Sequence, residues 1–140
     1  MLRVVLDTNV LVAAVRSRRG AAFALLSRVG TQEFDIALSV PLVLEYEEAL
    51  LRQLGETALR RSDVEVIIDY LCAVGKHQEI YFLWRPFLQD PEDDMVLELA
   101  VAAECEAIVT FNKRDFGGAE MFGIRVLGPI ELLREIGAVP

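Results

Sequence analysis

Histidine and cysteine are scarce in this sequence of 140 residues, and their scarcity excludes several kinds of site. There is one histidine, His77, and the two cysteines, Cys72 and Cys105, lie far apart and form no CxxC pair. Zinc centres and disulfide frameworks are built from clusters of these residues. Both cysteines lie within apolar helical patterns, so we expect them to be buried thiols.

Positive charge is also in short supply. Fourteen Lys and Arg residues oppose 22 Asp and Glu residues, which gives a formal net charge of −8. Broad, non-specific binding to nucleic acid normally requires an excess of basic residues. Either the substrate is not a polyanion, or the acidic residues are concentrated in one site where cations neutralise them.

Long hydrophobic runs are missing, although hydrophobic residues make up 54% of the chain and the mean hydropathy is +0.36. No apolar run approaches the ~20 residues of a membrane span. Nothing at the N-terminus is typical of an export signal, so we expect a cytoplasmic protein. The apolar surplus indicates a sheet covered on both faces and a patch for another chain, hence a homodimer, a higher homo-oligomer or a docked partner peptide.

The first strand sets the pattern for the rest of the chain. Residues 2–6 are mostly apolar and run into Asp7, Thr8 and Asn9, after which a helical apolar pattern begins. Buried parallel strands have this composition, and ligands bind beyond their carboxyl ends. Asp7 is therefore well placed to hold a ligand, but it is equally suited to cap the following helix.

Alternating strands and helices continue to the end of the chain, as in an α/β fold. The sequence predicts further strands at 34–39, 79–83, 107–110 and 124–127, and helices at 21–29, 42–54, 62–74 and 129–136, with another that follows the acidic run 90–94. No repeat or linker divides these elements. We expect a single domain over residues 1–140.

Several acidic residues lie where a structural role explains them poorly. Glu45 falls near the apolar side of its helix, where a carboxylate is costly without a partner or a metal. Asp94 lies at the edge of an apolar run, whereas the preceding Glu92 and Asp93 are explained as first-turn acids that complement the helix dipole. Asn112 and Asp115 follow the strand at 107–110.

Strand ends and the helix starts that follow them gather at one edge of a parallel sheet. Carboxylates that converge there would repel one another unless a divalent cation joined them. Ligation by oxygen alone indicates Mg²⁺ or Mn²⁺. Such ions lower the pKa of a bound water and stabilise the charges that develop in phosphodiester hydrolysis. A cation would also make an acidic pocket receptive to phosphate.

Four segments of the sequence resemble the PIN-domain family and occur in that family's order. They are LDTNVL at 6–11, SVPLVLE at 39–45, DMVLELA at 94–100 and VTFNKRDF at 109–116. The resemblance covers essentially the whole chain. The form of the run 90–94 is similar to a branch of the family regarded as toxin components of toxin–antitoxin systems.

The resemblance implies a three-layer α/β/α fold with a central parallel sheet of about five strands, and a ribonuclease that depends on Mg²⁺ or Mn²⁺. The residues that would bind the metal are Asp7, Glu45 and Asp94. The residues that would orient these carboxylates by hydrogen bonds are Asn9, Ser39 and Thr110.

The sequence departs from the family at one position. Many relatives carry a fourth acid two residues after the threonine, but this chain has the uncharged Asn112, with Asp115 three residues further on. We therefore expect Asp115 to join the metal-binding and catalytic acids and Asn112 to act by hydrogen bonding. Either of the two would position the attacking water or a second ion.

These features predict an endoribonuclease, the toxin of a toxin–antitoxin pair, with RNA as substrate and an antitoxin protein as partner. Basic residues that would contact RNA phosphates, or else form ordinary surface, are Arg16, Arg18, Arg19, Lys113 and Arg114.

Two other functions compete with this prediction. A PIN-like module that has lost catalysis and serves as a binding or scaffolding subunit is favoured mildly by Asn112 and by the net charge of −8. A phosphatase with a strand-end Asp nucleophile usually needs a second Asp two residues on, where this chain has Asn9. The phosphatase therefore ranks last.

Overall fold

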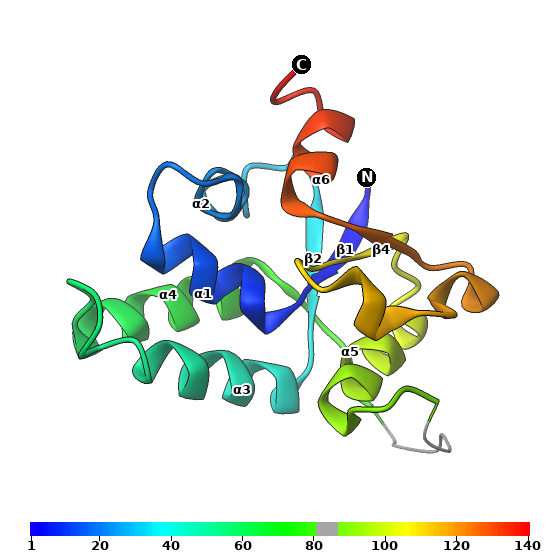
Figure 1. Cartoon of the computed structure of the whole chain (residues 1–140), viewed down its shortest axis with the longest axis horizontal. Helices are drawn as coiled ribbons and strands as arrows, with labels where there is room; N and C mark the ends of the chain where they lie inside the picture. Colours follow the sequence, from blue (N-terminus) through cyan, green and yellow to red (C-terminus); the bar gives the residue numbers. More distant parts are fainter. Residues whose placement is uncertain (81–86) are drawn as a thin grey trace.

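The computed structural model describes residues 1–80 and 87–140 and contains a five-stranded, all-parallel sheet (Figure 1). Its spatial order is β3-β2-β1-β4-β5. The strands are β1 (Arg3–Leu6), β2 (Asp35–Leu38), β3 (Lys76–His77), β4 (Ala107–Val109) and β5 (Arg125–Leu127). The predicted parallel sheet is confirmed.

The first strand lies at the centre of the sheet. Val4 is paired with Ile36 of β2 on one side and with Ala107 of β4 on the other. Val4 and Val5 are completely buried, and both neighbouring strands are almost as deeply buried. An apolar strand with a partner on each side and a helix layer on each face has this burial pattern. Asp7 therefore follows a deeply buried strand at the centre of the sheet.

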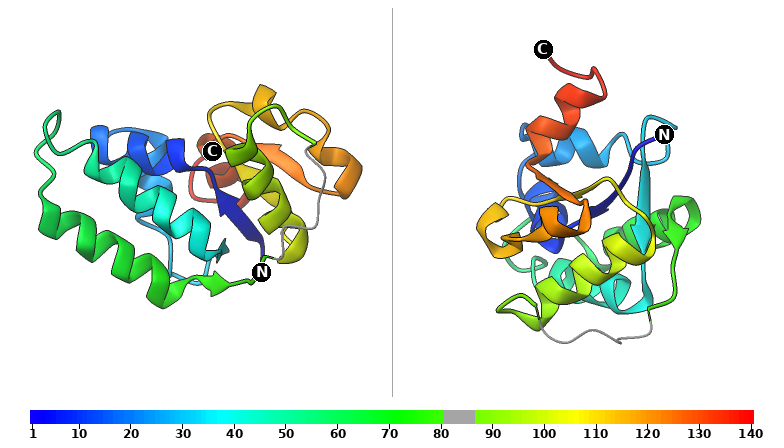
Figure 2. Two further views of the ribbon diagram at one scale, coloured as in Figure 1. Left: turned by 90° about the horizontal axis from the view of Figure 1, so that it is seen from below. Right: turned by 90° about the vertical axis from the view of Figure 1, so that its right-hand side faces the viewer.

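Among the described residues, six α-helices cover the sheet in two layers. They are α1 (Thr8–Arg16), α2 (Ala21–Leu26), α3 (Val40–Leu51), α4 (Arg61–Val74), α5 (Pro91–Ala102) and α6 (Pro129–Glu135). Figure 2 shows α1, α3 and α4 on one side of β1 and α5 on the other, where α5 contacts β1, β2 and β4. Two short 3₁₀ helices, η1 (Lys113–Phe116) and η2 (Ala119–Phe122), join β4 to β5. This is the expected three-layer α/β/α arrangement.

The third strand lies earlier in the chain than the sequence predicts. The predicted strand at 79–83 is replaced by β3, which pairs His77 with Leu38 directly after α4. Residues 79 and 80 are not in a strand, and 81–83 lie outside the described residues. A Cβ on Gly75 would lie 2.5 Å from Leu38 Cδ1, so the absence of a side chain lets α4 bring the chain onto β2 at this point.

The two thiols differ in burial. Cys105 is buried as expected, and burial raises the pKa of its thiol to about 12, whereas Cys72 is only half-buried. Within residues 1–80 and 87–140, no helix combines the length and apolar character that a membrane crossing requires.

One buried hydrogen bond fixes the end of β1 against α3. Tyr46 of α3 is 1% exposed, and its hydroxyl donates to the main-chain oxygen of Leu6, the residue before Asp7. Tyr46 thus connects the helix that carries Glu45 to the strand that positions Asp7. Loss of a partner from a buried carbonyl costs more than the net strength of the bond, because no water replaces it.

Replacing Tyr46 with Phe should therefore lower the free energy of unfolding by about 1–3 kcal/mol, measured by urea denaturation. Tyr70→Phe is the matched control, since it removes a hydroxyl that donates to Val29 O at 2.7 Å from a side chain that is 47% exposed. Water can replace the hydrogen bond of Tyr70, so Tyr70→Phe should lower the free energy of unfolding by less than Tyr46→Phe does. Equal decreases for the two variants would contradict the role given to the Tyr46 hydrogen bond.

Candidate functional site

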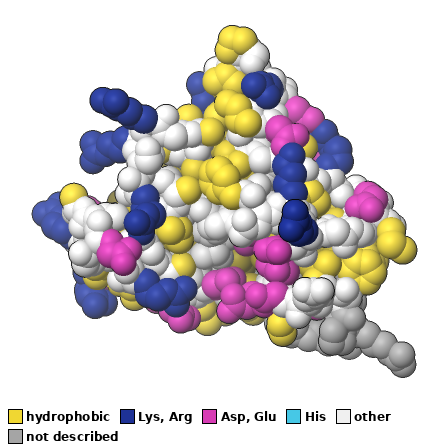
Figure 3. All heavy atoms as spheres, viewed as in Figure 1, with side chains coloured by type: hydrophobic (Ala, Val, Ile, Leu, Met, Phe, Trp, Pro, Cys, Tyr) yellow, Lys and Arg dark blue, Asp and Glu magenta, His cyan; other side chains and the backbone are white. Residues whose placement is uncertain are grey.

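The carboxyl ends of β1, β2 and β4 bring polar residues to one edge of the sheet. Asp7 follows β1, Ser39 follows β2 and Thr110 follows β4, and all three are buried. In Figure 3 a group of acidic side chains occupies the lower middle of the molecule, over the place where α1, α3 and α5 begin in Figure 1. This edge is where open α/β sheets bind their ligands.

Asp7 occupies the centre of this edge and is only 9% exposed. Its Oδ1 accepts the N–H of Thr8 at 2.9 Å, and its Oδ2 accepts the hydroxyl proton of Thr110 at 2.8 Å. Burial raises the pKa of Asp7 above its ordinary value, and these two hydrogen bonds oppose the rise. Asp7 is both the N-cap of α1 and a fixed carboxylate at the sheet edge, so the two interpretations of the sequence are compatible.

Thr110 is the centre of a small hydrogen-bond network around Asp7. Its hydroxyl oxygen accepts hydrogen bonds from Asn9 Nδ2–H at 3.3 Å and from the main-chain N–H of Asn112 at 3.0 Å, and the hydroxyl donates its own hydrogen bond to Asp7 Oδ2. Asn9 Oδ1 in turn accepts the N–H of Phe111 at 3.3 Å. The network ties the loop after β4 to the start of α1, and it fixes the rotamer of the Asp7 side chain.

Glu45 is the second acid at this edge, on α3. Its Oε2 is buried without a hydrogen-bond partner, as is the hydroxyl of Thr8. Burial raises the pKa of Glu45 to about 7, the carboxylates of Glu92 and Asp7 add to the rise, and the nearby Thr8 hydroxyl opposes it. A buried, unpartnered carboxylate oxygen is costly, so Glu45 is a position where a cation would be favoured.

The third acid comes from α5, and here the geometry differs from what the resemblance implies. The Oδ1 atom of Asp94 accepts the main-chain N–H groups of Phe87 and Leu88, at 3.2 and 2.8 Å. Asp94 therefore holds the segment before α5 in place. The acids of this helix whose charges interact with Asp7 are the preceding residues Glu92 and Asp93.

Asp93 is half-buried and lies within electrostatic range of the other acids. Burial raises the pKa of Asp93 to about 7, and the charges of Asp7 and Asp115 contribute to the rise. Sequence reasoning assigned Asp93 only to the helix dipole. The only indication in the sequence was the run of acids at 90–94. Adjacent side chains on a helix point in directions about 100° apart, and the run does not show which of them faces the sheet edge.

The remaining predicted polar residues take different places. Ser39 caps α3, and its Oγ accepts the N–H of Leu42 at 3.3 Å. Asn112 joins the Thr110 network through its main-chain N–H, while its side chain is exposed. Asp115 is exposed on η1, and its charge raises the pKa of Asp7 slightly. Of this group, Asp115 alone adds a negative charge to the site.

The basic residues separate into two groups. Arg16, at the far end of α1 and about 13 Å along that helix from Asp7, pairs with Glu56 at 2.9 Å. Arg18 and Arg19 are exposed in the turn that follows. The second group, Lys113 and Arg114, lies on η1 beside the acidic edge, and Lys113 pairs with Glu131.

The donor set fits a hard divalent cation. All of its side chains offer carboxylate oxygens, one of these oxygens is buried and unpartnered, and the pKa values of three of the acids are raised. As the side chains stand, no group of three acidic, His or Cys residues within the described ranges is close enough to hold a metal ion. A bound cation would have to draw these carboxylates together.

Comparison with known proteins agrees with the sequence motifs and the fold. A family model described as PIN domain matches residues 3–114. A chain in the crystal structure of VapBC2 from Rickettsia felis, bound to a DNA fragment from their promoter, is similar in fold. That chain is 13% identical, with a TM-score of 0.61 over 91% of this chain and 98% of its own length. No curated protein matches the sequence.

The raised pKa of Glu45 predicts a pH-dependent stability. The folded state holds this proton up to about pH 7, whereas the unfolded chain releases it near 4.5. The folded state thus binds more protons between these values, and its free energy of unfolding should fall as the pH rises from about 4.5 to 7.

Glu45→Gln removes this titration. In a chelating buffer the variant should therefore be more stable than the wild type at pH 8, with a smaller difference at pH 5, as measured by thermal unfolding. Glu47→Gln, an exposed neighbour on α3, should leave the pH dependence unchanged. A Glu45→Gln variant whose stability parallels that of the wild type at every pH would show that burial does not perturb this carboxyl.

Proposed function

Because the chain belongs to the PIN-domain family, we propose that it is a metal-dependent endoribonuclease and the toxin of a toxin–antitoxin pair. PIN domains are generally nucleases. The observation that carries the proposal is the fixed Asp7 carboxylate at the carboxyl edge of the sheet, with further acids from α3 and α5 beside it. RNA as the substrate and metal dependence are the parts that experiments must test.

The residues that would hold Mg²⁺ or Mn²⁺ are Asp7, Glu45, Asp93 and Asp115. Both oxygens of Asp7 already accept one hydrogen bond each, and each keeps a second lone pair for a cation. The buried Oε2 of Glu45 would gain the partner that it lacks. When bound, such an ion lowers the pKa of a ligated water and stabilises charge on phosphate oxygens.

The chain's own acids are suited to move a proton near neutral pH. General bases work best when their pKa lies near the working pH, and the pKa values of Glu45 and Asp93 are about 7. Whichever of these two carboxylates does not ligate the ion could accept the proton of a water that attacks a phosphodiester. Thr110 and Asn9 keep Asp7 in one orientation during this step, since their hydrogen bonds fix its rotamer.

An antitoxin protein is the proposed partner. Support comes from the likeness to a chain of the VapBC2 complex, which was crystallised with promoter DNA. The expected homodimer or higher homo-oligomer stays a prediction.

A catalytically inactive PIN module is the alternative. It is favoured by Asn112 in place of an acid and by the separation of the carboxylates as they stand. Calorimetric titration with Mn²⁺ distinguishes the two, because an inactive module should show no saturable site that depends on the carboxylates.

The purified protein should degrade single-stranded RNA in the presence of Mn²⁺ and stop when the metal is chelated. Asp7→Asn should lower the cleavage rate at least about 100-fold, since it removes a charge from the centre of the site while the amide oxygen can still accept one of the two hydrogen bonds. Cleavage would be followed on gels, and circular dichroism would show that the variant folds. Full activity in Asp7→Asn would refute the proposed site.

Asp93 and Asp94 allow a matched test, because replacing either with Asn makes the same change in charge at adjacent positions. Asp93→Asn should reduce both Mn²⁺ affinity and RNA cleavage by about 10- to 100-fold. Asp94→Asn should retain most of both, because the amide oxygen of Asn can still accept the N–H groups of Phe87 and Leu88. The reverse result would assign the metal to Asp94.

A further inference from the structure

Phe111 is an exposed aromatic side chain at the edge of the sheet that carries the acids. It directly follows Thr110, which is completely buried and bonded to Asp7, yet Phe111 itself is 52% exposed. The change from full burial to exposure within one residue shows that the two side chains turn in different directions. Thr110 faces the Asp7 carboxylate, and Phe111 faces solvent at the rim of the acidic site.

Packing does not explain why a phenylalanine occupies this position. The second phenylalanine of the segment, Phe116 on η1, is 1% exposed and belongs to the buried core. Phe87, an exposed ring whose N–H group binds Asp94, has a ring partner in Phe122 at 5.2 Å between centroids. Phe111 has no ring contact with a described residue. Single exposed apolar side chains are common on proteins, so its position beside the acids is what distinguishes Phe111.

Two hydrogen bonds fix the main chain around Phe111. Its N–H donates to Asn9 Oδ1 at 3.3 Å, and the next N–H, that of Asn112, donates to the Thr110 hydroxyl oxygen at 3.0 Å. Asn9 and Thr110 also belong to the network that orients Asp7. The same bonds therefore position the main chain of Phe111 relative to the carboxylate. A ring on an already ordered main chain loses less conformational entropy when it binds a ligand.

The Phe111 ring is attached a short distance from the place where a phosphate would be held. The Cα atoms of consecutive residues lie about 3.8 Å apart, and the Thr110 hydroxyl is 2.8 Å from Asp7 Oδ2. Neighbouring bases in a nucleic-acid strand are about 3.4 Å apart along the axis. A strand with one phosphate at the acids would thus bring a base one or two nucleotides away within reach of the ring.

The element that follows Phe111 supplies a cation for the backbone of such a strand. Arg114 of η1 is exposed and has no ion-pair partner among the described residues, whereas its neighbour Lys113 pairs with Glu131. Proteins that bind single-stranded nucleic acid combine aromatic rings, on which bases stack, with cations along the backbone. Phe111 and Arg114 provide one of each.

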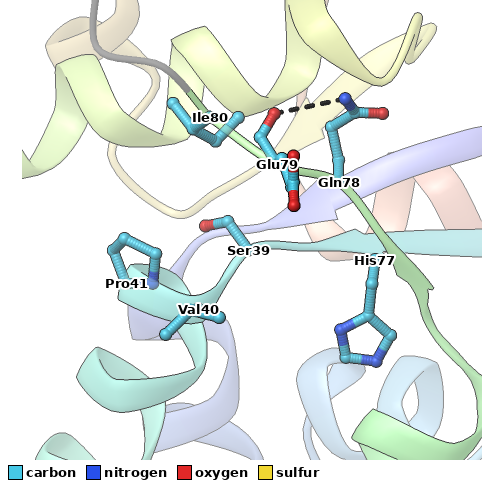
Figure 4. A pocket seen from close by; sticks show the side chains of 7 residues that line it. All are labelled: Ser39, Val40, Pro41, His77, Gln78, Glu79 and Ile80. Atoms are coloured by element: carbon cyan, nitrogen blue, oxygen red, sulfur yellow. Dashed lines mark hydrogen bonds between the residues drawn. The ribbon is translucent and has the colours of Figure 1, made fainter.

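On the other side of β1, the same edge ends in a pocket of about 400 Å³ beside the start of α3 (Figure 4). Val40, Pro41 and Ile80 supply its apolar surface. The ring of His77 turns toward α4, and its Nε2 is bonded to the main-chain oxygen of Cys72 at 2.9 Å. The described lining of this pocket includes no Phe, Tyr or Trp on which a base could stack, unlike the β4 end of the edge.

We propose that Phe111 binds the substrate strand by stacking on a base one or two nucleotides from the scissile phosphate, with Arg114 on the strand's backbone. This inference rests on the proposed ribonuclease function. A phenyl ring stacks on all four bases, because each base has a flat π-face. Phe111 therefore holds the strand across the acids without selecting its sequence.

Two single-stranded octamers with the same number of phosphates separate stacking from charge. One is an RNA octamer of adenylate, and the other is an octamer of ribose phosphates that carry no bases. Binding to the full chain would be measured by fluorescence anisotropy at several salt concentrations. Ca²⁺, which also takes oxygen ligands, would be supplied in place of Mn²⁺, and gels would confirm that the octamers stay intact.

Phe111→Leu keeps an apolar side chain but removes the ring. It should weaken binding of the adenylate octamer by about 5- to 150-fold, the range for one stacked base, and leave binding of the base-free octamer unchanged. Phe111→Trp should retain the wild-type affinity, and the adenylate octamer alone should quench its added fluorescence. Phe23→Leu is the matched control: this ring, on α2, is 37% exposed in a pocket with Val15 and Arg18, at the end of α1 far from Asp7.

Arg114→Gln should have the opposite signature. Removing a cation from the backbone contact should weaken binding of both octamers alike and lower the slope of log affinity against log salt concentration by about 0.7. Phe111→Leu should leave this slope unchanged, because the loss of a stacked base changes no contact with phosphate.

The stacking role would be overturned if Phe111→Leu weakened both octamers equally, if it left the affinity for adenylate unchanged, or if Phe23→Leu caused the same loss. Failure of the wild type to bind either octamer would also overturn it. An unchanged salt slope in Arg114→Gln would overturn the backbone contact. If the wild type cleaves RNA with Mn²⁺ but Phe111→Leu binds as the wild type does, the stacking proposal fails and the ribonuclease proposal stands. If the wild type cleaves no RNA, the ribonuclease proposal fails, and the octamers still decide whether Phe111 binds a base.

Discussion

The hydrogen bond from Thr110 to Asp7 is the interaction on which the rest of the site depends. It joins the ends of two neighbouring strands, β1 and β4, whose residues are about a hundred positions apart in the chain. A carboxylate that is 9% exposed stays in place only if its oxygens are bonded, and Thr110 and Thr8 bond one each. The same contacts leave lone pairs for a cation, so the bonds that make burial tolerable also keep the carboxylate available.

Burial of several acids at one edge explains the excess of negative charge. Neighbouring carboxylates contribute to the raised pKa values of Asp7, Glu45 and Asp93, and desolvation contributes the largest share of each rise. Such an edge repels phosphate until protons or cations neutralise it. The net charge of −8 is then compatible with a polyanionic substrate, because the acids that carry part of this charge would be neutralised at the site.

Neighbouring acids on α5 show how closely structure and chemistry are coupled. Asp94 accepts two main-chain N–H groups and fixes the segment that leads into the helix, while Asp93 contributes its charge to the sheet edge. Asp94 thus orders the main chain before α5, and the charge of the preceding residue, Asp93, interacts with Asp7. A shift of α5 by one residue would rotate its side chains by about 100°, so the packing of α5 on β1 and β4 determines which acids face Asp7.

The sequence by itself determined the parallel α/β fold and the places of Asp7, Glu45 and Thr110, because an apolar strand that ends in a polar residue and an apolar helical stripe are local patterns. It also indicated the family, since four short segments occur in order. Only the tertiary structure decided that Asp94 accepts main-chain N–H groups while the charge of Asp93 interacts with Asp7, that Ser39 caps α3, and that β3 lies at Lys76–His77. Each of these depends on which element packs against which, and periodicity along one segment carries no information about contacts between segments.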